Sequence, residues 1–405
     1  MTSDVLIAGG GYVGLSVAVA IKDAAPHLDV ILVDAAPEET LSSDERASAI
    51  AAAASRMLDK LGLWKPMLGH AQPIKEMIVT DSRTSDPVRP VFLTFGDVDE
   101  EENEPFAHML PNKVLVGELR KKAKAIGIEI MHGETVTGFN TGDVTTEITL
   151  GSGAQITAKL LIAADGVRSK LRDQAGIKTI NWSYDQMGIV TTVAHERPHE
   201  GRAEEHFLPG GPFATLPLTG NRSSLVWTEP TANAKRIMEM DDFSFELELE
   251  TRFGHRLGEI SVDGPRKAFP LGLTLARDFV SPRFALVGDA AHGIHPIAGQ
   301  GLNLGFKDAA ALAQTIVEAD RLGLDIGSQT VLERYQTWRR FDTVQMGVVT
   351  DVLNRLFSND NTPLRMLRTI GLGIVDRLPS LKTRFIDQAA GRKGSNPALL
   401  NGEAI

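Results

Sequence analysis

The chain has 405 residues, of which 42% are hydrophobic and 23% charged, a composition typical of a folded protein with a large core. Its net charge of −10 argues against nucleic acid as the main partner, because phosphate binding needs an excess of Lys and Arg. The absence of cysteine excludes disulfides, thiolate metal ligands and cysteine-linked cofactors. The N-terminal sequence lacks the pattern of a secretory signal and no apolar run is long enough for a membrane span, so the expected location is the cytoplasm.

The first 34 residues predict a β-α-β unit of a parallel, doubly wound sheet. Gly9, Gly11 and Gly14 form a GxGxxG motif between the first apolar run and the helix, and Asp34 ends the second run. The first glycine permits a tight turn, the second lets the backbone approach a pyrophosphate, and the third lets the helix pack close to the strand. A carboxylate at Asp34 can accept hydrogen bonds from ribose hydroxyls. The unit predicts a dinucleotide site, without separating NAD from FAD.

Two kinds of sequence alternate along the rest of the chain. Longer helical patterns, such as an alanine-rich helix expected over 47–63, accompany buried strands. We interpret these parts as one Rossmann-like layer made of residues 1–72, 112–178 and 282–345. Short strands and turns predict an inserted mixed β-sheet domain at 73–111 and 179–281, followed by a helical C-terminal segment at 346–405. The predicted fold class is α/β, with α+β character from the inserted sheet.

Two further acids follow buried strands. Asp165 and Gly166 come after the strand KLLIAA, and Asp289 follows the strand FALVG. Alone, an Asp-Gly pair is equally well explained as a simple turn. Because Asp34, Asp165 and Asp289 all lie at strand ends of one predicted sheet, we interpret them as the acids around one extended, polyhydroxylated ligand.

The stretch GDAAHGIHPIAGQGLN allows two interpretations. Asp289, His292 and His295 are three residues apart, which would suit a metal on a helix, but the intervening glycine and the following proline argue against a regular helix. No metal is expected, and the histidines are then ordinary loop residues. The alternative is a loop that opens a helix over 301–319, whose N-terminus carries about half a positive charge and would stabilise the anion of a reduced isoalloxazine ring. The residues of this anion cradle are Gly299, Gln300, Gly301, Leu302 and Asn303.

Together these residues resemble the flavin-dependent aromatic hydroxylases of the para-hydroxybenzoate hydroxylase type. GGGYVG with Asp34 is similar to the ADP-binding fingerprint of that family, ADGVRSKLR to its Asp-Gly motif and LVGDAAH to its Gly-Asp motif. Three segments are similar in more detail to the ubiquinone-biosynthesis branch, the polyprenylphenol hydroxylases: DERASAI, RKAFPL and HPIAGQGLNLGFKD. The resemblance covers nearly the whole chain. It implies FAD, bound non-covalently, with NAD(P)H as a transient reductant.

The resemblance also implies positions around the flavin. It places Asp289 on a ribityl hydroxyl, Asn112 near the ribityl chain and Arg46 near the flavin. The residues 299–303 would wrap the pyrimidine edge of the ring. These assignments are carried over from the family to the matching positions of this sequence.

The implied reaction is hydroxylation of the aromatic ring of a polyprenylated phenol in ubiquinone biosynthesis. NAD(P)H would bind transiently, in keeping with a single dinucleotide fingerprint, and Asp165 and Gly166 would serve both FAD and the passage of this reductant. Reduced FAD would react with O2 near Pro296 to give a C4a-hydroperoxide, which transfers one oxygen atom to the phenol. The alternatives are a hydroxylase of another phenolic substrate and a non-catalytic flavin-binding scaffold of a biosynthetic complex.

The sequence departs from para-hydroxybenzoate hydroxylase at the tyrosines that ionise the phenol. Only three tyrosines occur: Tyr12 in the fingerprint, Tyr335 in a late helix and Tyr184 in the predicted substrate sheet. Tyr184 is therefore the candidate catalytic base, alongside Pro296 near the reacting carbon. His206, in the segment EEHF, is an alternative base, or an ordinary residue of a sheet.

The C-terminal segment from 355 to 405 has eight Lys or Arg and four Asp or Glu, an excess of +4 in a chain of −10. Leucines and isoleucines recur at helical spacing between these charges. The pattern predicts an amphipathic surface that meets the inner membrane peripherally or contacts other ubiquinone-biosynthesis proteins. The alternative is a last helix that packs on the core.

Overall fold

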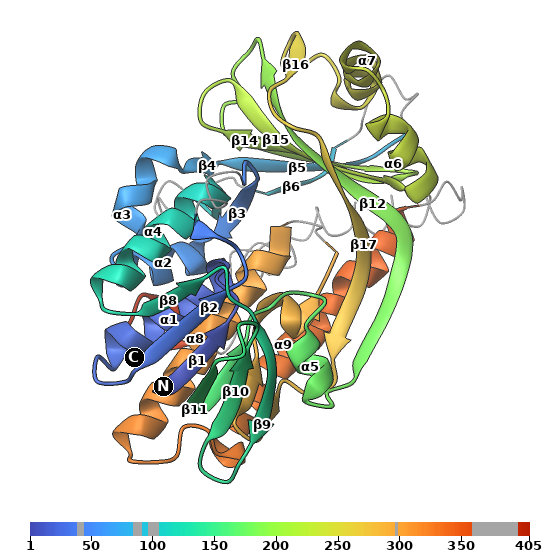
Figure 1. Ribbon diagram of the computed structural model, residues 1–405. Coiled ribbons are helices and arrows are strands. Elements are labelled where there is room, and N and C mark those ends of the chain that lie inside the picture. The colour runs from blue at the N-terminus through green and yellow to red at the C-terminus, as the bar shows by residue number, and fades with distance from the viewer. Residues whose placement is uncertain (39–43, 84–90, 96–104, 296–298, 359–395) are drawn as a thin grey trace.

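The computed structural model describes residues 1–38, 44–83, 91–95, 105–295, 299–358 and 396–405. Two large sheets are joined by a small one, and helices cover their outer faces (Figure 1). Two predictions from the sequence lie outside the described residues: Pro296, and most of the amphipathic C-terminal segment.

The first sheet has a parallel core in the order β8-β2-β1-β11-β19. These strands are β1 Thr2–Ala8, β2 Val30–Asp34, β8 Glu129–His132, β11 Gln155–Ala163 and β19 Phe284–Leu286. Antiparallel pairs add β9 Val136–Thr141, β10 Thr146–Leu150 and β18 Val280–Ser281. The central strands are continuous apolar runs because both faces of a parallel sheet are covered. The β-α-β unit predicted for the first 34 residues is confirmed.

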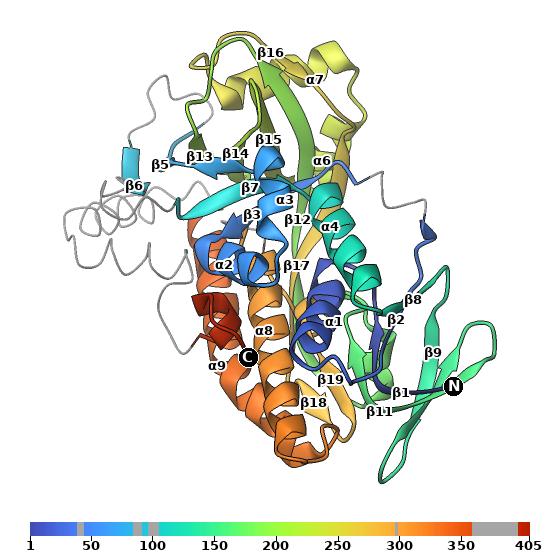
Figure 2. The same ribbon diagram turned by 90° about the vertical axis from the view of Figure 1, so that its left-hand side faces the viewer.

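Helices α1 Tyr12–Ala24, α4 Asn112–Ala125 and α8 Gln300–Arg321 lie together on one side of this sheet (Figure 2). Small residues let α1 and α8 approach closely: a Cβ added to Gly305 would lie 2.5 Å from a Val13 methyl carbon. The next helix, α9 Gln329–Phe357, runs without a break across residue 345, where the predicted C-terminal segment begins. Over the described ranges, none of the helices has both the length and the apolar character that crossing a bilayer requires.

The second sheet has nine strands in the order β20-β17-β12-β15-β14-β13-β5-β6, with β16 paired to β12. The strands are β5 Glu76–Asp81, β6 Val91–Phe95, β12 Thr179–His195, β13 Arg202–Leu208, β14 Gly211–Leu218, β15 Arg222–Pro230, β16 Ile260–Val262, β17 Lys267–Ala276 and β20 His292–Gly293. β13 and β5 are parallel and the other pairs antiparallel, so the sheet is mixed. Two long strands of this sheet, β12 and β17, extend towards the first sheet (Figure 1). The predicted fold class is confirmed.

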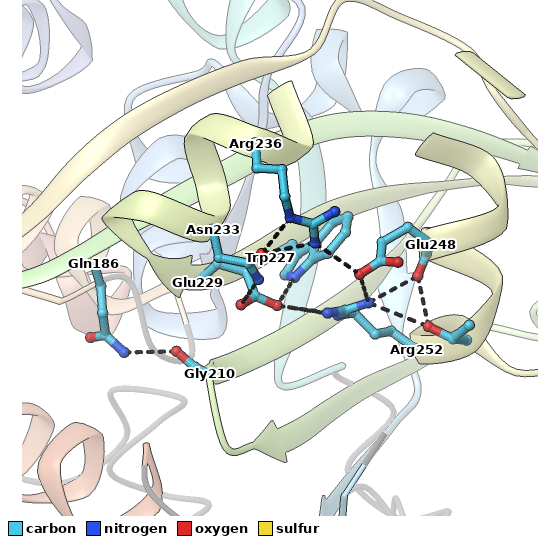
Figure 3. A network of polar contacts seen from close by, with 9 residues as sticks. Gln186, Gly210, Trp227, Glu229, Asn233, Arg236, Glu248 and Arg252 are labelled. Atoms are coloured by element: carbon cyan, nitrogen blue, oxygen red, sulfur yellow. Dashed lines mark hydrogen bonds and ion pairs between the residues drawn. The ribbon is translucent and has the colours of Figure 1, made fainter. Parts of the chain in front are cut away.

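Helices α6 Thr231–Met238 and α7 Asp242–Phe253 cover the outer face of the second sheet. Beneath them, the buried carboxylate of Glu229 accepts hydrogen bonds from Trp227 Nε1 at 2.9 Å and Arg252 Nη2 at 3.0 Å (Figure 3). A buried polar network whose members are paired holds its surroundings in place. The network ties the outer face of the second sheet to α7, which carries Arg252.

A small sheet of β3 Ala47–Ala51, β7 Ala107–Pro111 and β4 Gln72–Ile74 lies between the large ones (Figure 1). The predicted helix over 47–63 is wrong at its start, because β3 precedes α2 Ala52–Lys60. The backbone of β3 pairs with β7, and the Asn303 side chain accepts a hydrogen bond from Ala51 N at 2.9 Å. Tertiary pairing therefore overrides the helix propensity of alanine. Shorter elements are α3 Trp64–Met67, η2 Leu68–His70, α5 Lys170–Gln174, η3 Gly288–Ala290 and η5 Ala398–Asn401.

Candidate functional site

A cavity of about 340 Å³ lies where the three sheets meet. One wall carries the predicted cofactor positions Arg46, Asn112, Asp289 and residues 299–303 of the α8 N-terminus, together with Tyr12 and Ser48. The other wall is the inner face of the second sheet, where apolar and hydroxyl-bearing side chains dominate: Val190, Thr191, Pro212, Ala214, Leu216, Ser224, Val226 and Thr228. One cavity is thus lined by backbone and polar groups on one side and by largely apolar side chains on the other.

In the glycine turn after β1, two glycines are packed tightly against the neighbouring backbone and one has free space beside it. A Cβ at Gly9 would lie 2.2 Å from Ala164 O, and one at Gly14 would lie 2.0 Å from Gly9 O. A Cβ at Gly11 would meet nothing within 4 Å. The α1 helix also starts without a side-chain cap and without an acid in its first turn. This end of α1 therefore suits a bound anion that approaches the backbone at Gly11.

Asp34 lies against this turn and has a partner that the sequence did not reveal. Arg120 Nη2 on α4 donates to Asp34 Oδ2 at 2.6 Å, and both side chains are buried. The Nε and Nη1 groups of Arg120 are buried without a hydrogen-bond partner among the described residues. Burial lowers the pKa of Arg120, against the opposing effect of Asp34. A buried guanidinium with unused donors, beside the acid that the sequence predicts to bind ribose, indicates a ligand with acceptor oxygens at this point.

Asp165 and Gly166 follow β11, and Gly166 has a φ of +85°, which favours glycine. Burial raises the pKa of Asp165. Neither residue is among the described residues that line the cavity. Arg172, six residues after Gly166, is buried and donates to Ala290 O at 3.0 Å. It ties the Asp-Gly loop to the turn that carries Asp289.

The turn at Gly288 and Asp289 is held from below by Asp308 of α8. Asp308 Oδ2 accepts from Gly288 N at 3.0 Å and lies 2.5 Å from His292 Nε2, while Oδ1 accepts from Arg339 Nε at 2.9 Å. The Asp289 side chain itself projects into the cavity, where dense surroundings raise its pKa. His292 is buried against Asp308, whereas Asp289 faces the cavity. Among the described residues no three His, Asp or Glu side chains are placed to hold a metal.

The N-terminus of α8 is built around Gly299 and Asn303. Gly299 is the N-cap at φ +62°, and the helix has neither a side-chain cap nor an acid in its first turn. The Asn303 side chain donates to Ala49 O at 2.9 Å and so fixes α8 against β3. Opposite, the Asn112 side chain accepts from Ser48 Oγ at 2.8 Å. The positive end of a long helix dipole therefore faces the cavity, as the anion-cradle interpretation requires.

Arg46 also lines the cavity, where it is held by two contacts. Its Nε donates to Asp44 Oδ1 at 2.8 Å, and its guanidinium carbon lies 5.5 Å from the centre of the Phe269 ring. The side chain is about half exposed, 48%. Arg46 is thus a positioned cation at the junction of the two walls.

The two candidate bases lie away from the cavity surface. The Tyr184 ring packs edge-on against His295, with ring centres 5.4 Å apart, and burial together with Asp351 raises the pKa of its hydroxyl. His206 Nδ1 contacts Thr80 Oγ1 at 2.7 Å on the opposite face of β13. Glu205, one residue earlier, lines the cavity instead. The sequence EEHF does not indicate whether Glu205 or His206 faces the cavity, because both faces of β13 mix polar and apolar residues.

Comparisons with known proteins agree with this geometry. Residues 2–346 match the family described as FAD binding domain. The chain is 42% identical over 404 residues to ubiquinone hydroxylase UbiL of Rhodospirillum rubrum, covering 98% of this chain and 92% of that protein. It is 33% identical to 3-demethoxyubiquinol 3-hydroxylase of Escherichia coli, covering 96% and 98%. Among solved structures, p-nitrophenol 4-monooxygenase PnpA of Pseudomonas putida is similar in fold, with a TM-score of 0.79, 19% identity and coverage of 97% and 100%.

The fold and the cavity define a flavoprotein of the FAD-dependent monooxygenase class. The chain belongs to the FAD-binding domain family, and FAD is its cofactor. The residues fit this group: the open side of Gly11, the unused donors of Arg120 and the uncapped starts of α1 and α8 are the features that a dinucleotide with a flavin would occupy.

Proposed function

We propose that the protein is an FAD-dependent monooxygenase that hydroxylates the aromatic ring of a polyprenylated phenol in ubiquinone biosynthesis. The observation that carries the proposal is the cavity, which connects groups suited to FAD with an apolar wall suited to a phenol and its isoprenoid tail. The relatives named as ubiquinone-pathway hydroxylases cover 98% and 96% of the chain, which supports this substrate class.

In this proposal the ADP half of FAD lies at the start of α1. The pyrophosphate approaches the backbone at Gly11, and Asp34 accepts hydrogen bonds from the ribose. The two unused donors of Arg120 point to a further contact with the same half of the cofactor. Asp165 and Gly166, which do not line the cavity, remain assigned to both FAD and the passage of NAD(P)H.

The flavin half is assigned to the cavity. Asp289 and Asn112 hold the ribityl chain, Arg46 lies beside the ring, and the backbone of residues 299–303 stabilises negative charge on its pyrimidine edge. Bound FAD would accept electrons from NAD(P)H and would activate O2. The protein's own part is to orient the phenol and exclude water, and Pro296 keeps its proposed place near the reacting carbon.

The test is turnover with purified protein, FAD, NAD(P)H and 2-prenylphenol. The proposal expects reductant oxidation that the phenol stimulates and a product with one added oxygen atom, found by mass spectrometry. A flavin-binding scaffold would bind FAD without stimulated oxidation, and a reductase would consume reductant without adding oxygen. Either of those results contradicts the proposal.

We also propose that the protein works against a membrane surface, because its substrate carries an isoprenoid tail. On α9, Phe341, Val344, Val348 and Val352 follow one another at helical spacing, and their side chains are 75%, 40%, 53% and 52% exposed. Such an exposed apolar stripe favours contact with lipid. Co-sedimentation with phospholipid vesicles tests this, and a double variant Phe341→Ser, Val348→Ser that binds as well as the parent protein would contradict it.

A further inference from the structure

The pairing of the second sheet places one acid in the apolar wall of the cavity. Glu205 pairs with Ala214, Ala214 with Val226, and Val226 with Val190, so the four residues form one row across four strands. All four line the cavity. Residues opposite one another share a face of a sheet, and their neighbours along each strand point to the other face. Glu205 is therefore directed at the space that the phenol is proposed to occupy.

Glu205 is isolated within this wall. Glu205 is only 3% exposed. Its carboxyl group has no hydrogen bond or ion pair with any described residue. Burial alone raises its pKa to about 7. Buried carboxyl groups are normally paired, so an unpaired one facing a substrate cavity indicates a group kept for the substrate.

The other ionisable side chains of the cavity lie on different elements. They are Tyr12, Glu45, Arg46, Lys267, Asp289 and His295. None of them perturbs the pKa of Glu205, for which burial is the one cause. Lys267 lies at the far end of the row of Glu205, paired with Val190, at four strand spacings or about 19 Å. On the outer face of β13, Glu204 is paired with Arg256 at 2.7 Å and with His206 at 3.4 Å.

Of the groups that could take a proton, Glu205 is best matched to neutral pH. A general base works best when its pKa is near the operating pH. Burial lowers the pKa of His295 to about 4, which makes it a weak proton acceptor. Tyr184 has a raised pKa, so its hydroxyl is seldom ionised. Glu205 combines a suitable pKa with a place on the cavity wall.

We propose that Glu205 is the proton acceptor for the phenolic hydroxyl of the substrate, an inference that rests on the hydroxylase function proposed above. As the ring gains oxygen, the phenolic O–H bond breaks, its electron pair forms a ring carbonyl, and the proton moves to a Glu205 carboxylate oxygen. The hydrogen on the newly hydroxylated carbon then leaves as a proton to solvent, and Glu205 returns its proton to the carbonyl oxygen as the ring becomes aromatic again. Overall, the phenol, O2, NAD(P)H and one proton give the hydroxylated phenol, water and NAD(P)+.

The test compares the pH dependence of kcat/KM for hydroxylation of 2-prenylphenol in the parent protein and in Glu205→Gln, Glu205→Asp and Glu204→Gln. The parent rate should rise with pH to a plateau above about 7, where the carboxylate is formed. In Glu205→Gln the rate should fall by about 100-fold or more and the rise should disappear, because general-base catalysis contributes about 10²–10⁴-fold. Glu205→Asp should keep the rise at a reduced rate, and Glu204→Gln, on the outer face, should keep the parent profile.

A structural role would give a different pattern. Thermal melting and FAD titration show whether each variant folds and binds cofactor. Glu205→Gln is expected to bind FAD as the parent does and to melt at no lower a temperature. A Glu205→Gln protein with the parent rate and pH profile overturns the role of Glu205 alone, as does a Glu205→Asp protein without the rise. A parent protein that makes no hydroxylated product overturns the proposed function, and this inference with it.

Discussion

His292 and Asp308 form a hydrogen-bonded pair that solvent does not reach, with Nε2 2.5 Å from Oδ2 and both side chains 0% exposed. The same carboxylate holds Gly288 N and Arg339 Nε, so one acid on α8 sets the turn that presents Asp289 to the cavity. Burial opposes ionisation of Asp308, but His292 and Arg339 prevail and lower its pKa.

Replacing Asp308 by Asn should therefore destabilise the fold. The substitution removes the buried carboxylate that pairs with the Arg339 guanidinium, which costs about 3–5 kcal/mol. Because the folded-state pKa is lowered, the contribution of Asp308 is present above its unfolded pKa and is lost as the pH falls through the folded value. Denaturant unfolding of parent and variant at several pH values measures this. Equal stability near neutral pH would contradict the structural role.

The glycine turn offers a matched pair of variants. Gly14→Ala places a Cβ 2.0 Å from Gly9 O, so we expect a loss of stability of at least about 1–3 kcal/mol. Gly11→Ala meets nothing within 4 Å and should fold with a loss within about 1 kcal/mol. Its FAD affinity should nevertheless fall by at least about tenfold, or about 1.4 kcal/mol, because the methyl group would occupy the pyrophosphate's approach. Unchanged FAD affinity in Gly11→Ala would remove the ADP site from this turn.

The pair of Asp34 and Arg120 should matter for FAD binding, in addition to its contribution to the fold as a buried ion pair. Asp34→Ala removes hydrogen bonds to a charged acceptor that contribute about 1.5–3 kcal/mol, so FAD affinity should fall by about 10- to 100-fold. Arg120→Ala should weaken FAD in the same direction, since its donors are lost. Lys121→Ala is the control, because its side chain is 75% exposed and pairs with Glu118. Fluorescence titration of the apoprotein with FAD distinguishes these cases.

Asp289 should bind FAD best as a carboxylate. Its side chain faces the cavity, where the surrounding protein limits its solvation and raises its pKa, so FAD affinity should decline as the pH falls through that raised value. Asp289→Ala should bind FAD at least about tenfold more weakly at neutral pH and lose this pH dependence. Asp173→Asn, whose side chain is 72% exposed, serves as the control. A parent-like titration by Asp289→Ala would contradict the assignment of the ribityl chain to this residue.

Glu205 should lower the stability of the apoprotein at neutral pH. Its pKa is 4.5 when unfolded and about 7 when folded, so stability is full below about 4.5 and declines until the pH passes about 7. The loss is about 3 kcal/mol at 1.36 kcal/mol per pKa unit. Glu205→Gln should escape it, and the two proteins should therefore diverge between about pH 4 and pH 8. If the difference in unfolding free energy between the two proteins stayed constant over that pH range, the Glu205 carboxyl would not be buried without a partner.

The sequence predicted the parts of the site whose geometry is local. The turn of Gly9, Gly11 and Gly14 can be read from spacing because the backbone conformation of a few neighbouring residues decides it. The partner of Asp34 could not be predicted in this way, since Arg120 lies 86 residues further on and reaches the acid only through the packing of α4. Glu205 and His206 differ by one position, and only the pairing of β13 with its neighbours decides which of them faces the cavity.

The most direct measurement is the origin of the oxygen in the product. Turnover of 2-prenylphenol by the FAD-loaded protein with NAD(P)H under isotopically heavy O2, in ordinary water, is followed by mass spectrometry. Ring hydroxylation by a flavin monooxygenase predicts one heavy oxygen atom in the new hydroxyl group and none when the label is supplied in water. A product whose new oxygen comes from water, or reductant consumption that yields no hydroxylated phenol, would contradict the account.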